Sequence, residues 1–63
     1  MKKYIVRDET TDRQLPHQYD NFQQAETAAR KHLDRFPDHE CELLIFEVIP
    51  LGYHVRKRKN NAH

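Results

Sequence analysis

The sequence predicts a small α+β domain, with a small antiparallel sheet of three or four strands and one helix packed on one face. A chain of 63 residues has room for a single hydrophobic core. Only one segment repeats its apolar residues with the period of a helix, and the other apolar residues fall in short β-branched or aromatic runs. The expected order is strand, helix, hairpin, with one domain at residues 1–58 and a flexible C-terminal tail at residues 59–63.

The first strand is predicted at Tyr4-Ile5-Val6, where β-branched and aromatic residues stand between charged ones. The polar run from Asp8 to Gln14 is typical of a turn or loop. Residues 13–19 are expected to return as a short edge strand, because Pro16 lacks the backbone donor that a central strand needs.

The clearest predicted element is a helix from about Asn21 to Phe36, which Pro37 ends. Its apolar residues recur at spacings of three and four and form one stripe: Phe22, Ala25, Ala29, Leu33 and Phe36. Asp20 is the expected N-cap, with Gln23 as its capping-box partner. The helix therefore has one face to bury against the sheet.

The hairpin is predicted from an apolar run at residues 41–49 and a returning strand at residues 53–58. Between them, Pro50 presets the first corner of a tight turn. Gly52, the only glycine, is expected to take the positive φ that a three-residue loop requires.

This turn sets Ile49 opposite Tyr53, and side-chain alternation then divides the sheet between two faces. The face toward the helix carries Cys41, Leu43, Ile45, Ile49, Tyr53 and Val55. The opposite face carries the residues expected to bind a partner: Ile5, Arg7, Leu44, Phe46, Val48, His54, Arg56 and Arg58. One helix covers only one face, so this apolar cluster is predicted to be an interaction site. The alternative is that the loop around Leu15, Pro16 and Tyr19 folds over it.

Composition points to a cytoplasmic protein without a membrane partner. Cys41 is the only cysteine, which fits a reducing compartment, and no stretch approaches the roughly 20 apolar residues that span a bilayer. Residues 1–55 carry seven Lys and Arg against ten Asp and Glu, whereas residues 56–59 are all basic. Such a basic end favours binding to nucleic acid or to an acidic protein surface. The alternative is that it serves only to keep the chain soluble.

No catalytic residue, cofactor or metal site is expected. The chain has no Ser and one Gly, and Cys41 lies in an apolar strand, which argues against nucleophilic catalysis and phosphate loops. Of the five histidines, only His39 lies close to Cys41, and the others are scattered over predicted loop, helix, strand and tail. A structural zinc site needs four well-spaced ligands, so surface histidines are the expected interpretation.

Three functions stay open on these residues. The first is a non-enzymatic protein that binds a protein partner through the uncovered sheet face. The second is direct nucleic-acid binding, in which Phe46 and Tyr53 or Tyr4 stack on bases. The phosphate contacts would come from Arg56, Arg58, Arg7 and Lys3. The third is a homodimer in which two uncovered faces bury one another, because a chain this short is only marginally stable alone.

The order of the segments carries one resemblance. A Tyr-Ile-Val strand and a polar loop lead into a helix with Gln24-Ala25-Glu26, followed by Leu44-Ile45-Phe46-Glu47 and a final strand after Gly52. This plan resembles that of short phage-encoded anti-CRISPR proteins over nearly the whole chain, as a pattern that transfers no functional residue. The resemblance implies a non-enzymatic inhibitor that docks on a CRISPR effector or another nucleic-acid-handling complex.

Overall fold

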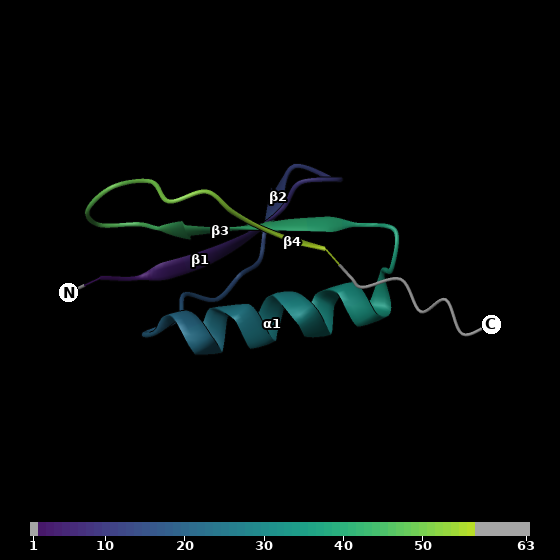
Figure 1. Cartoon of the computed structure of the whole chain (residues 1–63), viewed down its shortest axis with the longest axis horizontal. Helices are drawn as coiled ribbons and strands as arrows, with labels where there is room; N and C mark the ends of the chain where they lie inside the picture. The colour runs from purple at the N-terminus through teal and green to yellow at the C-terminus, as the bar shows by residue number, and fades with distance from the viewer. Residues whose placement is uncertain (1, 57–63) are drawn as a thin grey trace.

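The structure, a computed structural model, describes residues 2–56, in which one helix lies across a four-stranded antiparallel sheet (Figure 1). The elements are β1 (Tyr4–Asp8), β2 (Arg13–Gln14), α1 (Phe22–Arg35), β3 (Glu40–Ile45) and β4 (Tyr53–Arg56). The strand order is β2-β1-β3-β4, so β1 and β3 are central. The predicted α+β class is confirmed. The predicted domain end at residue 58 and the tail at residues 59–63 lie outside the described residues.

The connection between β1 and β2 is a tight turn in which one residue, Asp12, has a positive φ. Asp12 has a φ of 60°, a conformation that Asp tolerates better than most side chains, and its carboxylate forms an ion pair with Arg7. β2 is an edge strand, as predicted, but it covers only the first two of the expected residues 13–19 and ends ahead of Pro16. After it, the Leu15 amide still donates to the Val6 carbonyl at 2.8 Å.

The helix α1 begins one residue later than predicted, and its N-cap is Asn21 rather than Asp20. The Asn21 side chain accepts a hydrogen bond from the Gln24 amide at 2.8 Å. Asp20 instead forms an ion pair with Lys3, its Oδ1 lying 2.7 Å from Nζ. This pair ties the start of the helix to the start of β1. At 14 residues and with a largely polar surface, the helix of the described residues does not meet the requirements of a membrane span.

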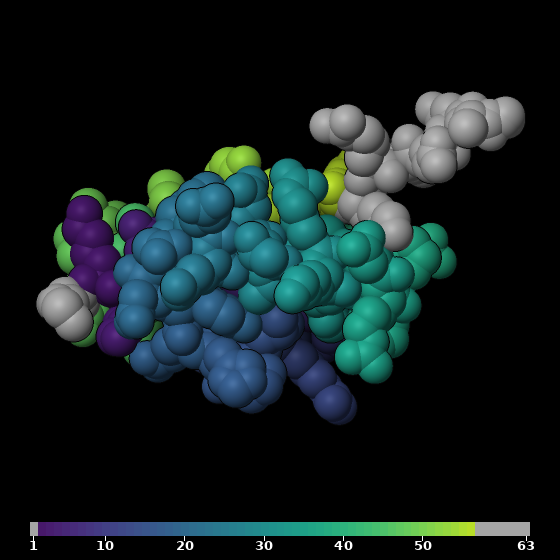
Figure 2. Space-filling view, turned by 90° about the horizontal axis from the view of Figure 1, so that it is seen from below, coloured from purple at the N-terminus to yellow at the C-terminus, as the bar shows by residue number. Residues whose placement is uncertain are grey.

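The hydrophobic core lies between α1 and the sheet. Its buried side chains are Val6, Ala25, Ala29, Leu33, Cys41, Leu43 and Val55. Two alanines on the buried stripe let the helix lie close to the strands, and Leu33 and Leu43 fill most of the remaining volume. Figure 2 shows this side of the molecule, where α1 and the segment before it cover the sheet.

The two ends of the predicted helix stripe differ from its centre. Phe22 is half-buried, and its ring makes edge-to-face contacts with Tyr4 and Tyr53 at centroid distances of 6.0 and 5.1 Å. Phe36 is 44% exposed and lies outside the core. The stripe is therefore confirmed at its centre, whereas its last member is not a core residue.

The predicted register of β3 and β4 is wrong by six residues. Leu43, not Ile49, lies opposite Tyr53, and β3 ends at Ile45. Residues 46–52 form the connection in place of a three-residue turn. Because the shift is an even number of residues, the paired side chains of the two strands keep their predicted faces.

Packing and charge both explain the observed register. It places Val55 beside Cys41 and against α1, whereas the predicted register sets Val55 opposite Glu47, far from the helix centre. It also places Arg56 opposite Glu40, and opposite charges directly across a ladder stabilise it. The turn-based prediction considered only the shortest connection and neither of these interactions.

Gly52 does not take the positive φ predicted for it, because the longer loop needs no tight corner there. An added Cβ would meet only the flexible end of Glu42, with Oε2 at 3.0 Å. We expect Gly52→Ala to change the free energy of unfolding by less than about 0.5 kcal/mol, measured by urea denaturation. A loss above about 1 kcal/mol would show that Gly52 needs a backbone conformation closed to Ala.

Candidate functional site

The sheet face that α1 does not cover has a less exposed centre than predicted. Leu44 is half-buried, and Ile5, its cross-strand neighbour, is only 3% exposed. Ile5 therefore offers little surface to a partner, which corrects its expected exposure. The alternative was that the loop around Leu15, Pro16 and Tyr19 folds over this face. Leu15 and Tyr19 instead pack against the core, on the helix side of the sheet.

The basic residues around this face are paired with acids. Arg7 forms its ion pair with Asp12. Glu40 receives two partners from β4, because its Oε1 lies 2.6 Å from His54 Nε2 and its Oε2 lies 3.1 Å from Arg56 Nε. The hydrogen bond from His54, aided by the Arg56 charge, lowers the pKa of the Glu40 carboxyl. Arg58, the remaining predicted contact, lies outside the described residues.

The exposed apolar side chains gather instead in residues 46–52, here called the apolar loop. Its large apolar residues are Phe46 at 58% exposed, Val48 at 61%, Ile49 at 67% and Leu51 at 43%. The loop projects at the end of the sheet where β1 begins, beyond the start of α1 (Figure 1). Its base is fixed by the Phe46 amide, which donates to the Lys3 carbonyl at 2.7 Å.

The apolar loop borders a small hollow. This pocket has a volume of about 240 Å³ and is lined by Lys2, Ile45, Val48, Ile49, Pro50 and Leu51. The other lining residues are apolar, and Lys2 brings a positive charge to the lining. Two of the residues predicted to bind a partner, Phe46 and Val48, thus belong to one exposed apolar surface at the sheet end.

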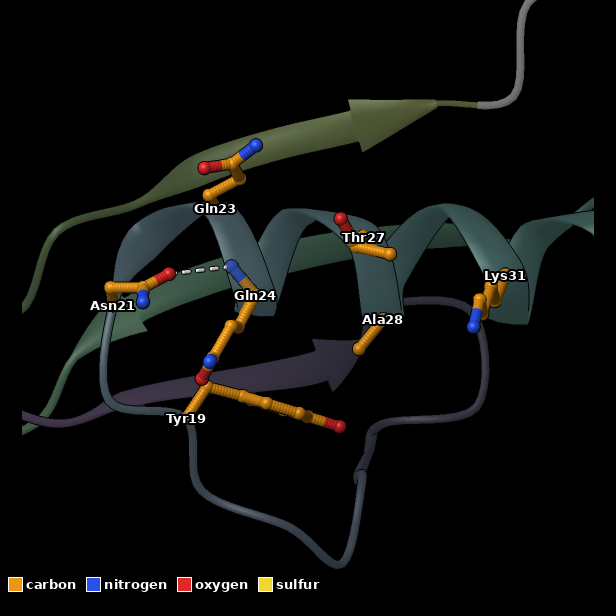
Figure 3. Close-up of a pocket in the computed structure, with 7 residues that line it drawn as sticks. All are labelled: Tyr19, Asn21, Gln23, Gln24, Thr27, Ala28 and Lys31. Carbon is orange, nitrogen blue, oxygen red and sulfur yellow. Dashed lines mark hydrogen bonds between the residues drawn. The ribbon is translucent and has the colours of Figure 1, made fainter.

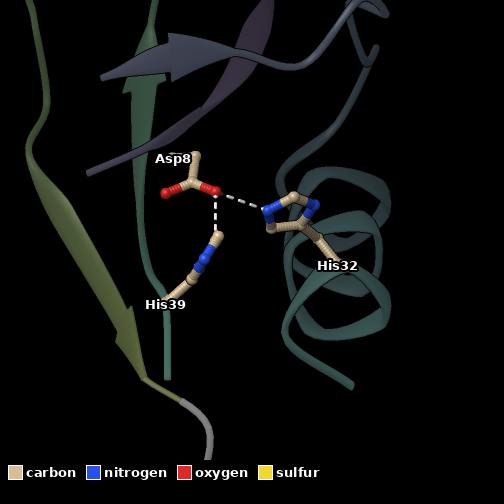
Figure 4. A group of neighbouring side chains, drawn as sticks. All are labelled: Asp8, His32 and His39. Atoms are coloured by element: carbon tan, nitrogen blue, oxygen red, sulfur yellow. Dashed lines mark hydrogen bonds and ion pairs between the residues drawn. The ribbon is translucent and has the colours of Figure 1, made fainter. Parts of the chain in front are cut away.

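A second cluster lies at the other end of the sheet, where Asp8, His32 and His39 meet (Figure 4). Asp8 is the last residue of β1, His32 lies in the last turn of α1, and His39 directly precedes β3. One carboxylate oxygen, Asp8 Oδ2, lies 2.6 Å from His32 Nε2 and 2.7 Å from His39 Nδ1. The fold therefore gathers three polar side chains from three different elements.

The carboxylate at the centre of this cluster is buried and fully engaged. Asp8 is 2% exposed, and its other oxygen, Oδ1, accepts hydrogen bonds from the Thr10 and Thr11 amides at 2.9 and 3.1 Å. Burial raises the pKa of the Asp8 carboxyl, but the hydrogen bonds from His32, Thr11, His39 and Thr10 outweigh it and hold the pKa well below its ordinary value. Asp8 is consequently a carboxylate in the folded protein.

The cluster opens on a pocket of about 380 Å³. Its walls combine the three cluster residues with the β1–β2 hairpin and Phe36, whose ring stacks on His39 at a centroid distance of 5.0 Å. Cys41 pairs with Asp8 across the ladder but is fully buried in the core. Burial, and then the Asp8 charge, raises the pKa of its thiol to about 11, so Cys41 is a poor nucleophile at neutral pH.

A further pocket, of about 620 Å³, lies along the first turns of α1 (Figure 3). Its lining combines Tyr19, which precedes the helix, with Asn21, Gln23, Gln24, Thr27, Ala28 and Lys31, and the Gln24 side chain reaches toward Tyr19. Lys31 is the only charged residue of its lining. This groove offers mainly hydrogen-bonding groups, and its lining contains no His, Cys, Asp or Glu.

Sequence reasoning missed the Asp8 cluster because its members come from separate elements. His32 and His39 are seven residues apart, and the chain reverses between them at the end of α1. Asp8 is much farther away in sequence and reaches them through the pairing of β1 with β3. The one available signal is a polar residue ending a central strand.

No protein-family model, no curated protein and no solved structure matches this chain.

Proposed function

We propose that this chain is a non-enzymatic binding protein that docks on a protein partner through the apolar loop. The observation that carries the proposal is the exposure of four large apolar side chains, between 43% and 67%, within seven consecutive residues. Isolated apolar residues on a surface are ordinary, whereas a contiguous group of this kind usually marks an interaction site.

Burial of this loop by a partner has a substantial driving force. Complete burial of one Val, Leu, Ile or Phe side chain is worth about 1.5–3 kcal/mol, and the loop offers Phe46, Val48, Ile49 and Leu51 together. Part of that gain offsets the entropy of association. Phe46 is the expected anchor, because an aromatic ring buries much area and loses little rotamer entropy.

The chemistry of the partner follows from the small pocket beside the loop. Its apolar walls accept one apolar side chain, and Lys2 in its lining favours a carboxylate next to that side chain. We therefore infer a protein surface that presents an apolar residue beside Asp or Glu. The resemblance to anti-CRISPR inhibitors supports a subunit of a nucleic-acid-handling complex as the source of that surface, in the cytoplasm.

Direct binding of nucleic acid is the weaker candidate for the described residues. Of its expected phosphate contacts, Arg56 already pairs with Glu40, Arg7 with Asp12 and Lys3 with Asp20. A phosphate that binds Arg56 must displace the Glu40 carboxylate from it, and the two negative charges would then lie close together. A second copy of this chain stays an alternative occupant of the apolar loop, and the experiment below separates the two.

The test uses a photoreactive side chain at position 49 to capture the partner in the cells that produce this protein, with the same group at position 36 as control. The captured protein is then purified and titrated by calorimetry. Phe46→Ala or Ile49→Ala is expected to weaken binding more than about 30-fold, which corresponds to about 2 kcal/mol. The thermal midpoint of each variant should stay close to that of the wild type.

Phe36→Ala is the matched control, since it removes an exposed Phe of the same chain outside the apolar loop. It should bind as the wild type does. Unchanged affinity in both loop variants would exclude the apolar loop as the contact. If the species captured at position 49 is this chain itself, and its mass in sedimentation rises with concentration, the occupant is a second copy.

A further inference from the structure

The Asp8–His32–His39 cluster has the donor set of a transition-metal site. Two imidazole nitrogens and one carboxylate oxygen converge, and the three ligand atoms lie within 4.8 Å of one another. Zn²⁺ is bound in many proteins by His and Asp or Glu, and two His with one carboxylate is a recurrent set for other divalent first-row metals. Mg²⁺ and Ca²⁺ prefer oxygen ligands and fit this set poorly.

The spacing of the ligand atoms is close to what a metal needs. In a tetrahedral site with bonds of about 2.0–2.1 Å, neighbouring ligand atoms are about 3.3–3.4 Å apart. Asp8 Oδ2 lies 2.6 Å from His32 Nε2 and 2.7 Å from His39 Nδ1, as hydrogen bonds. To reach tetrahedral spacing, each imidazole nitrogen must move away from Asp8 Oδ2 by less than about 1 Å. The two nitrogens, which lie within 4.8 Å of one another, must also come to about 3.3–3.4 Å apart. Both histidines line a pocket that leaves space for their rings to move.

The surroundings of the cluster orient its ligands. The Thr10 and Thr11 amides hold Asp8 Oδ1, which leaves Oδ2 to face the histidines. The Phe36 ring stacks on His39 and lies 5.0 Å from the His32 ring, which restricts both imidazoles. Hydrogen bonds and packing around the ligands are what metal sites use to fix ligand geometry.

We propose that Asp8 Oδ2, His32 Nε2 and His39 Nδ1 bind one divalent first-row transition metal. The three ligands leave at least one coordination position, and the adjacent pocket gives water or a small anion access to it. The metal joins β1, the end of α1 and the start of β3, and so stabilises the fold of a small chain without disulfides by binding the native state. This site is separate from the apolar loop, which lies at the other end of the sheet.

A competing interpretation is that the histidines only satisfy a buried carboxylate. Both interpretations place the same side chains together, but only the metal site predicts that one metal ion binds per chain. The experiment uses the whole chain, treated with a chelator and dialysed, and adds Zn²⁺ in a calorimeter. Co²⁺ is added in parallel, since its visible absorption reports the number and kind of ligands.

The variants separate the cluster from the other histidines. His39→Gln should lower the Zn²⁺ affinity by more than about tenfold, since even loss of a group that only supports a ligand costs about 10- to 100-fold. The control carries His17→Gln, His54→Gln and His63→Gln together, which keeps only the two cluster histidines. It should bind one metal per chain with an affinity within about twofold of the wild type.

A second measurement needs no variant and so does not depend on how His39→Gln folds. In the ¹⁵N-labelled wild type, one equivalent of Zn²⁺ should shift the imidazole nitrogen signals of His32 and His39 and leave that of His17 unchanged. Absence of stoichiometric binding by the wild type overturns the proposal. Loss of binding in the triple control, or retention of full affinity in a folded His39→Gln variant, overturns it as well.

Discussion

Asp8→Ala is expected to destabilise the chain by about 3–5 kcal/mol, because it removes a buried charged group that holds a network of hydrogen bonds together. The Asp8 carboxylate is 2% exposed and accepts hydrogen bonds from two imidazoles and two amides. Without it, the Thr10 and Thr11 amides and both histidines lose their common acceptor. A domain of this size has about 3–9 kcal/mol of total stability, so much of the population should unfold.

The measurement is urea denaturation followed by circular dichroism, with EDTA present so that metal ions do not contribute. Asp38→Ala is the matched control, because Asp38 is exposed in the turn after α1. It should change stability by less than about 0.5 kcal/mol. Asp8→Asn should fall between the two, because the amide oxygen still accepts from the turn amides. If Asp8→Ala is no worse than Asp38→Ala, the cluster does not support the fold.

Leu33→Ala is the second large effect we expect, a loss of about 2–5 kcal/mol in the free energy of unfolding. Leu33 is 1% exposed and is one of the largest fully buried side chains in the described core. The substitution removes apolar contacts and leaves a cavity between α1 and the sheet. The core offers few other large side chains to collapse into that space, because Ala25 and Ala29 lie on the same stripe.

Lys31→Ala serves as the control for Leu33→Ala, since Lys31 is exposed on the same helix. Alanine is a slightly better helix former than lysine, so this variant should be neutral within about 0.5 kcal/mol. Thermal melts of both proteins give the comparison. Equal midpoints would mean that the buried face of α1 is assigned to the wrong residues.

The helix could be predicted from the sequence because its signals are local. The spacing of Ala25, Ala29 and Leu33 indicated the buried face, and Pro37 marked the end. The N-cap shifted by one residue for a nonlocal reason, because Asp20 forms an ion pair with Lys3, just before β1. Asp20 and Asn21 both suit an N-cap, and only a tertiary contact decides which of them takes that position.

The register of the hairpin depended on contacts that local rules do not include. A turn at Pro50 was consistent with the sequence, but the observed pairing brings Val55 under the helix and Arg56 to Glu40. The predicted faces of the two strands are still correct, because side chains alternate with a period of two and the register error is an even number of residues. The exposed apolar surface was consequently expected on the sheet face, whereas the longer connection places it in residues 46–52.

The Asp8 cluster shows a different limit of sequence reasoning. Metal-ligand motifs are read from close, regular spacings within one or two elements. Here His32 belongs to a helix, His39 to a loop, and Asp8 to a strand that pairs with β3, more than 30 positions later in the sequence. Their proximity is a product of the complete fold, and it could be predicted only after the β1–β3 register is known.

The central position of β1 has a consequence for how the chain folds during synthesis. Tyr4 pairs with Ile45 and Asp8 with Cys41, so the partners stand 41 and 33 positions apart in sequence. At about 5–20 residues per second, β1 leaves the ribosome roughly 2–8 s before its main partner is made. During that interval α1 can form from local signals alone, while β1 has only the short β2 to pair with. Assembly of the sheet must therefore wait for the second half of the chain, and the long loop it closes favours slow folding for so small a domain.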